Sequence, residues 1–247
     1  MLDKFRLFWH KNFNAKRPVH YHQMVSKYNS YYNALNSDLK ETFLERIHFS
    51  SKFIDFKPVD FDEVSEEMKV IITSALIQIT FGLENYVLNK FSTLYVVPST
   101  YYNFGSYKNL LGHVDFDAMC IVISWPSVQD GFIIPDDATN VALHELAHAI
   151  QEEDRIRTMG NKFFNSYKME TWENEAVKKL ALIQAKENLF LKNYGGNNML
   201  ELLAVSIEAF FEKPVEFKEK LPKLFEKLAA LLNQDPTKGE NPILVKH

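Results

Sequence analysis

The 247-residue sequence has little cysteine, no excess of basic charge and no long apolar run. Its single cysteine, Cys120, cannot form an internal disulfide, so the chain does not require an oxidising compartment. Because it lies in the apolar segment DAMCIVISW, we expect Cys120 to be a buried small hydrophobic residue rather than a nucleophile. The net charge is −4 with both signs interspersed, which argues against a nucleic-acid-binding surface.

Signals for export and for membrane insertion are also weak. The longest apolar run, residues 70–83, has 14 residues and falls short of the roughly 20 that a membrane-spanning helix needs. It predicts a buried helix instead. The first seventeen residues are too charged for the core of a signal peptide. We therefore expect a cytoplasmic protein with no membrane segment in this chain.

The periodicity of the sequence predicts many helices around a small sheet. A capping box at Asp38 and Glu41 is expected to begin one helix, and Pro135 with two aspartates is expected to begin the helix that carries residues 141–154. Residues 100–116 look like a loop. The order of elements predicts a mainly helical α+β fold, with one domain over residues 1–247. The predicted helices cover 18–35, 36–53, 65–83, 135–154, 170–190, 198–212 and 221–233, and the predicted strands cover 92–99 and 117–125.

The segment VALHELAHAIQEED, residues 141–154, contains the pattern that carries chemistry. His144 and His148 are four residues apart, so on a helix their side chains share one face and can bind one metal ion. Glu145 points away from that face and can instead hold a water molecule at the metal. This is the HExxH arrangement of zinc hydrolases. The alternative, two solvent-facing histidines, is weakened by the apolar residues that surround the motif.

A catalytic zinc site needs a third protein ligand and an open position for water. A histidine six residues after His148 would supply it in one class of enzymes, but Asp154 occupies that position. The remaining source is a glutamate on a later helix. An apolar helix face favours Glu201 or Glu208 over Glu173 and Glu175, which we expect to be exposed, because a carboxylate on an apolar face is costly unless it is paired or bound to metal. The other candidates, of which Glu175 is the main rival, are Glu170, Glu173 and Glu175.

Several segments together resemble the Mlc titration factor A family of zinc-dependent peptidases, which is related to the catalytic domain of anthrax lethal factor. They are HELAHAIQ, a later Trp, YGGNNMLELLAVSIEAFFEKPVEF, LLNQDP, IVISWPSVQDGF and KFIDFKPVDFDEVSEEMKVIITSALIQITFGL. The resemblance covers roughly residues 35–236, whereas residues 1–16 have no counterpart. It implies a zincin-like metallopeptidase fold with the small sheet beside the HExxH helix.

The resemblance also implies roles for single residues. It makes His144, His148 and Glu201 the ligands of Zn²⁺, and Tyr194 a donor to the oxyanion that forms during peptide hydrolysis. Glu145 would be the general base. Glu208, seven residues after Glu201 and on the same helix face, would orient a ligand histidine or form a salt bridge in the core.

Two functions follow from this interpretation. The first is a zinc-dependent peptidase that acts on peptide or protein substrates through a metal-activated water. The second is a zinc-containing regulatory protein with little peptidase activity, because the family is named for sequestering a transcriptional repressor. Glu145 favours the first, since a purely structural zinc site needs no base and fills its fourth position with protein.

Overall fold

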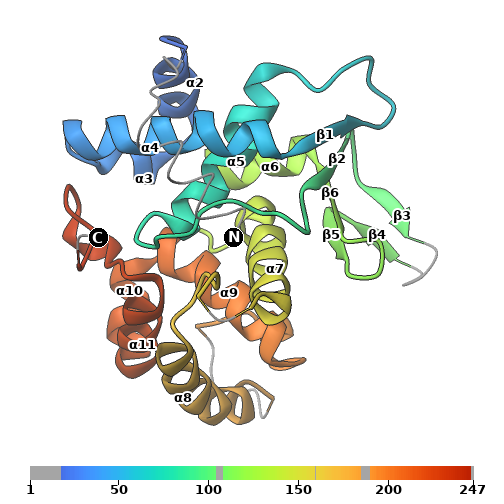
Figure 1. The fold of residues 1–247 in the computed structure, drawn as a ribbon. Coiled ribbons are helices and arrows are strands. Elements are labelled where there is room, and N and C mark those ends of the chain that lie inside the picture. Colours follow the sequence, from blue (N-terminus) through green and yellow to red (C-terminus); the bar gives the residue numbers. More distant parts are fainter. Residues whose placement is uncertain (1–17, 104–107, 159, 185–189, 246–247) are drawn as a thin grey trace.

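The computed structural model describes residues 18–103, 108–158, 160–184 and 190–245, except for the side chains of Lys108, Asn193 and Tyr194. The predicted N-terminal extension, residues 1–16, lies outside this part. Helices make up most of the described chain (Figure 1). The α-helices are α2 (Tyr21–Tyr28), α3 (Ser30–Ala34), α4 (Ser37–Ser50), α5 (Glu66–Thr80), α6 (Trp125–Ile133), α7 (Val141–Ile156), α8 (Ser166–Gln184), α9 (Met199–Glu212), α10 (Pro214–Lys220) and α11 (Pro222–Leu232). Short 3-10 helices are η1 (Ser51–Phe53), η2 (Asn193–Gly196) and η3 (Pro236–Lys238).

The described strands form a four-stranded sheet in the order β1-β2-β6-β5 and a separate two-stranded hairpin. In the larger sheet, β1, β2 and β6 are parallel, and β5 runs antiparallel to β6 at one edge. The hairpin of β3 and β4 projects beyond that edge (Figure 1). The strands are β1 (Asp55–Pro58), β2 (Thr93–Val97), β3 (Tyr101–Asn103), β4 (Lys108–Leu110), β5 (Gly112–Asp115) and β6 (Cys120–Ser124).

Side-chain caps set the starts of the helices that matter for the site. The side chain of Asn140 accepts the N–H of Leu143 at the start of α7, and Asn198 accepts the N–H of Glu201 at the start of α9. Each asparagine satisfies one of the N–H groups that a helix start leaves without a partner. The cap on α9 also fixes Glu201 in the first turn, where the helix dipole stabilises its negative charge.

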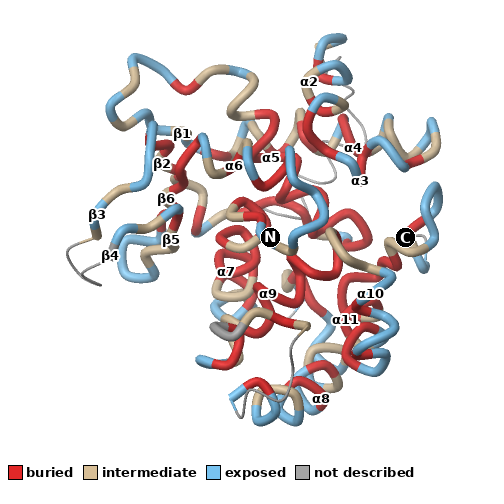
Figure 2. The backbone as a smooth tube through the Cα atoms, turned by 180° about the vertical axis from the view of Figure 1, so that it is seen from behind, coloured by how far each residue is buried: buried red, intermediate tan, exposed pale blue. Residues whose placement is uncertain are grey.

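The hydrophobic core lies where α5, α7 and α9 meet. Residues 70–80 of α5 are all buried, as the apolar run predicted, and α7 packs against both α5 and α9. Figure 2 shows the buried segments concentrated on these central helices, while α8 and the outer strands are partly exposed. The chain therefore places its metal-binding motif on a helix that is held on several sides.

The mainly helical α+β architecture and the small sheet beside α7 confirm the predicted fold class. The strands over β2 and β6 and the helices over α5, α9 and α11 were also predicted correctly. Cys120 is buried, as expected. Among the described residues, no helix is both long enough and apolar enough to cross a membrane.

Several local predictions were wrong. Residues 100–116 are not a loop, since β3, β4 and β5 lie there; these strands are short, and pairing with β6 rather than local propensity stabilises β5. Helices α6 and α10 and strand β1 were not predicted. The predicted helix over 18–35 is two helices, broken at Asn29, which caps α3. Helix α8 begins at Ser166, earlier than expected, and the predicted end of that helix falls partly on residues outside the described part.

Two predicted helix starts were also misplaced. Helix α4 is capped by Asn36, whose side chain accepts the N–H of Leu39, so Asp38 lies inside the first turn and forms no capping box with Glu41. Helix α7 begins at Val141, after the aspartates that follow Pro135. In both cases an asparagine is the cap: Asn36 lies two positions before Asp38, and Asn140 lies three positions after Asp137.

Candidate metal centre

Helices α7 and α9 bring three predicted ligands to one point. The Nε2 atoms of His144 and His148 are 3.0 Å apart. One oxygen of Glu201 lies 3.3 Å from Nε2 of His144 and 3.6 Å from Nε2 of His148. Helices α7 and α9 pack against each other, and Figure 1 shows α9 passing beside α7. In the described part of the chain, this is the one group of histidine, cysteine and acidic residues that could hold a metal ion.

The spacing of these three atoms fits a tetrahedral zinc site. Zinc binds nitrogen and carboxylate oxygen at about 2.0–2.2 Å, so two ligand atoms on a tetrahedron lie roughly 3.3 Å apart. The observed separations of 3.0, 3.3 and 3.6 Å are close to that value. Two imidazoles and one carboxylate also match the ligand set of catalytic zinc sites, which leaves one position open. The residues present therefore fit a zinc ion.

The electrostatics of the site favour positive charge. Burial alone lowers the pKa of His144, but hydrogen bonds and charge from Glu201 and Glu208 outweigh it and raise the pKa to about 10. Burial raises the pKa of Glu201, yet the two histidines reverse this and lower it to about 2. A cation at this point is thus strongly stabilised. By contrast, the pKa of His148 is lowered, chiefly by burial, which keeps its imidazole neutral and able to bind metal.

Glu208 lies behind His144, on the side away from the other ligands. One of its oxygens is 2.7 Å from Nδ1 of His144, and the residue is only 1% exposed. Its other oxygen accepts the N–H of Asn140 and the ammonium of Lys192, each at 2.9 Å. With Nδ1 donating to Glu208, the lone pair on Nε2 of His144 is directed at the metal position. Both alternatives considered for Glu208 are therefore present, the bond to a histidine and a salt bridge.

Glu145 is buried beside this cluster but outside it. It is 6% exposed, and its carboxylate accepts no hydrogen bond from the residues that the structure describes. Burial raises its pKa to about 7; the charge of His144 opposes this rise, while Glu201 and Glu208 add to it. A carboxylate with a pKa near neutrality and no protein partner is suited to taking and returning a proton.

Gly112 in the edge strand β5 leaves room for the side chain of Glu145. A side chain at Gly112 would place a Cβ 2.8 Å from Cγ of Glu145, closer than such atoms approach, and 3.1 Å from Cγ2 of Val141, which is a tight contact. Next to it, Nδ1 of His113 is hydrogen-bonded to the hydroxyl of Tyr101. The pKa of Tyr101 is raised by burial and by the charge of Glu145, so the hydroxyl stays protonated near the site.

The other predicted residues are not brought to this point. Glu175 is buried rather than exposed as expected, because α8 packs against α11, and it pairs with Lys178 at 2.9 Å and Lys179 at 3.6 Å. It belongs to no metal-binding group in the described chain. The side chain of Tyr194 lies outside the described residues. Its backbone belongs to η2, which packs against α9, so its predicted role stays a prediction.

The structure adds residues that the sequence interpretation missed. Lys192, Asn140 and Gly112 each contact the cluster or the glutamates next to it. None belongs to a recognisable motif, because each acts through a contact between distant parts of the chain. The one usable signal was Asn140, a good capping residue directly before the apolar helix.

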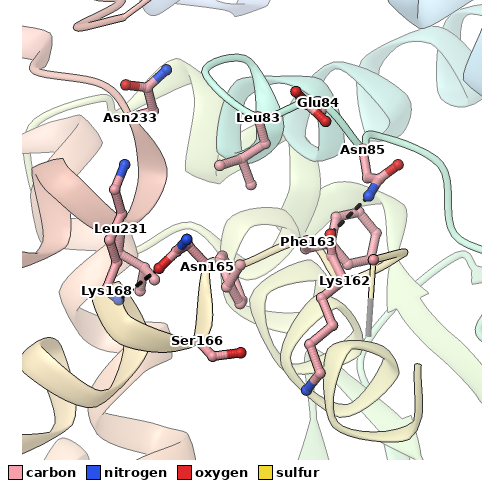
Figure 3. Close-up of a pocket in the computed structure, with 12 residues that line it drawn as sticks. Leu83, Glu84, Asn85, Lys162, Phe163, Asn165, Ser166, Lys168, Leu231 and Asn233 are labelled. Carbon is pink, nitrogen blue, oxygen red and sulfur yellow. Dashed lines mark hydrogen bonds between the residues drawn. The ribbon is translucent and has the colours of Figure 1, made fainter. Parts of the chain in front are cut away.

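A separate pocket of about 420 Å³ lies away from the candidate metal centre (Figure 3). It is formed by the segment after α5, the chain leading into α8, and α11. Leu83, Leu231 and Phe163 lie among its apolar residues, and Asn85 and Lys168 among its polar ones. None of the three metal-facing residues lines it.

Comparison with known proteins agrees with this site. Residues 6–232 match the model of a family described as glucose-regulated metallo-peptidase M90. Proteins named Mlc titration factor A from Escherichia coli (strain 55989 / EAEC) and Shigella flexneri are 29% identical to this chain over 124 residues. The aligned region covers 47% of this chain and 45% of each relative, so the chain spans less than half the length of these relatives. Because the family model matches nearly the whole chain, this protein belongs to the glucose-regulated metallo-peptidase M90 family.

Proposed function

We propose that the protein is a zinc-dependent peptidase in which His144, His148 and Glu201 hold the metal and Glu145 is the general base. The observation that carries the proposal is the position of Glu145. It is a buried carboxylate with a raised pKa, it has no hydrogen-bond partner in the described chain, and it lies directly beside three converging ligands. A site that held zinc for structural reasons alone would need no such group.

When bound, zinc would lower the pKa of a water molecule and polarise the carbonyl of the scissile peptide bond. Glu145 would take the proton of that water and return it to the leaving amine. Glu208 would hold Nδ1 of His144, which keeps the ring in the orientation and tautomer that a ligand needs. Tyr194 would donate a hydrogen bond to the developing oxyanion, a role that follows from the family resemblance.

The sheet offers a way to bind an extended substrate. Strand β5 lies at the edge of the sheet and pairs with β6 alone among the described strands. It also packs against α7, beside Glu145. A peptide that added to this edge through main-chain hydrogen bonds would therefore pass close to the metal-binding residues. Such binding depends little on side chains, which suits peptide or protein substrates of varied sequence.

A second candidate function rests on the names of the relatives. Mlc titration factor A is named for titrating Mlc. By that analogy, this chain would act as a zinc-containing regulatory protein that sequesters a transcriptional repressor, with little peptidase activity. This function needs no catalytic base, so it does not account for the environment of Glu145.

One experiment separates the two functions. We expect the purified protein to contain about one zinc per chain and to cleave a library of short peptides. Glu145→Gln should keep the zinc and lower turnover by at least about a hundredfold, a typical contribution of a general base. His148→Ala should lose the zinc. Equal turnover by wild type and Glu145→Gln would contradict the role of Glu145, whereas zinc binding without turnover by either would favour the regulatory function.

A further inference from the structure

Lys192 connects a distant segment to the group that holds His144. It lies in the irregular chain just before η2, and its ammonium is 2.9 Å from one oxygen of Glu208. The side chain of Lys192 is 26% exposed and that of Glu208 only 2%. The charge of the lysine therefore reaches a carboxylate that has almost no contact with water.

Glu208 depends on its protein partners because it is buried. A buried carboxylate is costly unless opposite charge and hydrogen bonds compensate it. Protein groups contact both of its oxygens: one oxygen lies 2.7 Å from Nδ1 of His144, and the other accepts from Asn140 and from Lys192. Lys192 and the backbone of Asn140 thus hold the second oxygen, which leaves the first directed at the imidazole.

We propose that Lys192 is a positioning residue for the metal centre, which acts through Glu208 to fix the imidazole of His144 as a ligand. The proposal rests on the proposed function, because it assumes that His144 binds the metal. Lys192 also lies two residues before Tyr194, so the same contact ties the backbone that enters η2 to the carboxylate behind His144. The ion pair between Lys192 and Glu208 would therefore fix both the orientation of His144 and the position of the chain that enters η2.

Removal of the ammonium has a specific consequence. Without it, the second oxygen of Glu208 keeps the N–H of Asn140 but loses the nearby positive charge of the lysine. The carboxylate is then held less firmly, and it orients the imidazole of His144 less strictly. Loss of a group that orients a metal ligand typically weakens metal binding by about 10- to 100-fold. A lysine that only stabilised the fold would not change metal affinity in this way.

The test measures zinc affinity by competition with a chromogenic chelator, together with the melting temperature of the metal-free protein. We expect Lys192→Met to raise the zinc dissociation constant by about 10- to 100-fold, and Lys192→Arg, which keeps the charge, to restore most of the affinity. Lys218→Met is the matched control, because Lys218 pairs with a buried carboxylate at 3.1 Å, Asp235, which does not contact the metal-facing residues in the described chain. It should leave the affinity unchanged.

The outcomes distinguish this inference from the proposed function. If the wild type binds no zinc, both fail. If the wild type binds zinc and Lys192→Met binds it equally well, only the role of Lys192 is overturned. A lower melting temperature with an unchanged dissociation constant would likewise assign Lys192 to stability alone. If Lys192→Met does not fold, Lys192→Gln replaces it with the same expected loss of affinity.

Discussion

Both halves of α7 bury acidic side chains, but the two halves differ in how many hydrogen bonds those side chains receive from the protein. In the second half, Glu153 is fully buried and its carboxylate accepts hydrogen bonds from three consecutive backbone N–H groups and from Arg157. The three groups belong to Asn89, Lys90 and Phe91. Its neighbour Asp154 accepts from the backbone of Phe163 and Phe164. Every buried charge in this half is compensated by the protein.

In the first half, Glu145 is nearly as buried, yet no group in the described chain donates a hydrogen bond to it. The histidines on either side of it face a carboxylate across a gap that fits a metal ion. Burying a carboxylate without hydrogen-bond donors costs free energy, so a protein retains such a group where the group has a function. The comparison teaches that the degree of compensation, rather than burial itself, separates an acid that stabilises the fold from one that is available for chemistry.

The largest effect is expected from Glu153→Gln, which removes the charge from the compensated half. Arg157 would lose its charged partner in a buried place while keeping its hydrogen bonds to the backbone of Asn161 and Val87. Loss of one member of a buried pair typically costs about 3–5 kcal/mol of stability. Denaturant unfolding should show this loss, while zinc affinity per folded molecule stays unchanged. Glu152→Gln is the control, because its partner Arg155 is largely exposed and the pair should contribute little. A loss of zinc affinity in Glu153→Gln would show that the two halves are not independent.

Tyr194→Phe tests whether Tyr194, two residues after Lys192, supplies a hydrogen-bond donor to the site around Glu145. We expect zinc content and melting temperature to stay nearly unchanged. The value of kcat should fall more than KM rises, because a bond to an oxyanion forms mainly in the transition state. One such donor is typically worth about 2.7–4 kcal/mol. A change confined to KM would instead make Tyr194 a substrate contact, and a loss of stability with normal kinetics would make it a packing residue.

A smaller effect is expected from Gly112→Ala, which crowds Glu145, the proposed base, without touching a proposed metal ligand. The added Cβ would force Glu145 to move, since it would lie 2.8 Å from Cγ of that side chain. Displacement of a catalytic group lowers turnover, and we expect kcat to fall by about tenfold, with zinc affinity retained. Steady-state kinetics with zinc analysis of the same sample would measure both. Full activity would mean that Glu145 does not need its present position.

The sequence predicted the central helices better than the short strands and the contacts between distant segments. The i, i+4 spacing of His144 and His148 and the apolar character of α5 and α9 are local patterns, and the helices that they predicted are present. A glutamate in the first turn of an apolar helix indicated Glu201, although only the family resemblance ranked it above Glu208. The structure places Glu201 with the two histidines, in agreement with that ranking.

What the sequence did not predict depends on contacts between distant segments. Strand β5 has no strong strand propensity of its own and forms because β6 pairs with it. The contact of Lys192 with Glu208 and the approach of Gly112 to Glu145 join residues that are remote in the chain or lie on different elements. No local pattern encodes such contacts. The burial of Glu175 has the same cause, because it follows from the packing of α8 against α11.

The smallest expected effect concerns Glu212, one turn beyond Glu208 on α9. Burial raises the pKa of Glu212 to about 8, and the charges of Glu208 and Asp137 act in the same direction, while hydrogen bonds from Asn140 and Thr139 oppose the rise. This carboxyl is therefore an intermediate case between the two halves of α7: it accepts the N–H of Thr139 at 2.9 Å but is not compensated enough to ionise easily.

The sign of its pH dependence follows from linkage. The folded protein binds the proton of Glu212 up to about pH 8, whereas the unfolded chain releases it near pH 4.5, the ordinary pKa of a glutamate. Between these values the folded state holds more protons, so the contribution of Glu212 to stability falls as the pH rises and is lowest above about pH 8. Glu212→Gln keeps an acceptor for Thr139 and removes the titration. We expect its melting temperature to exceed that of the wild type by a margin that grows from pH 5 to pH 9, in scans with matched buffers. A margin that does not change with pH would show that Glu212 is ionised in the folded protein, and that Thr139 and Asn140 compensate it as completely as the backbone compensates Glu153.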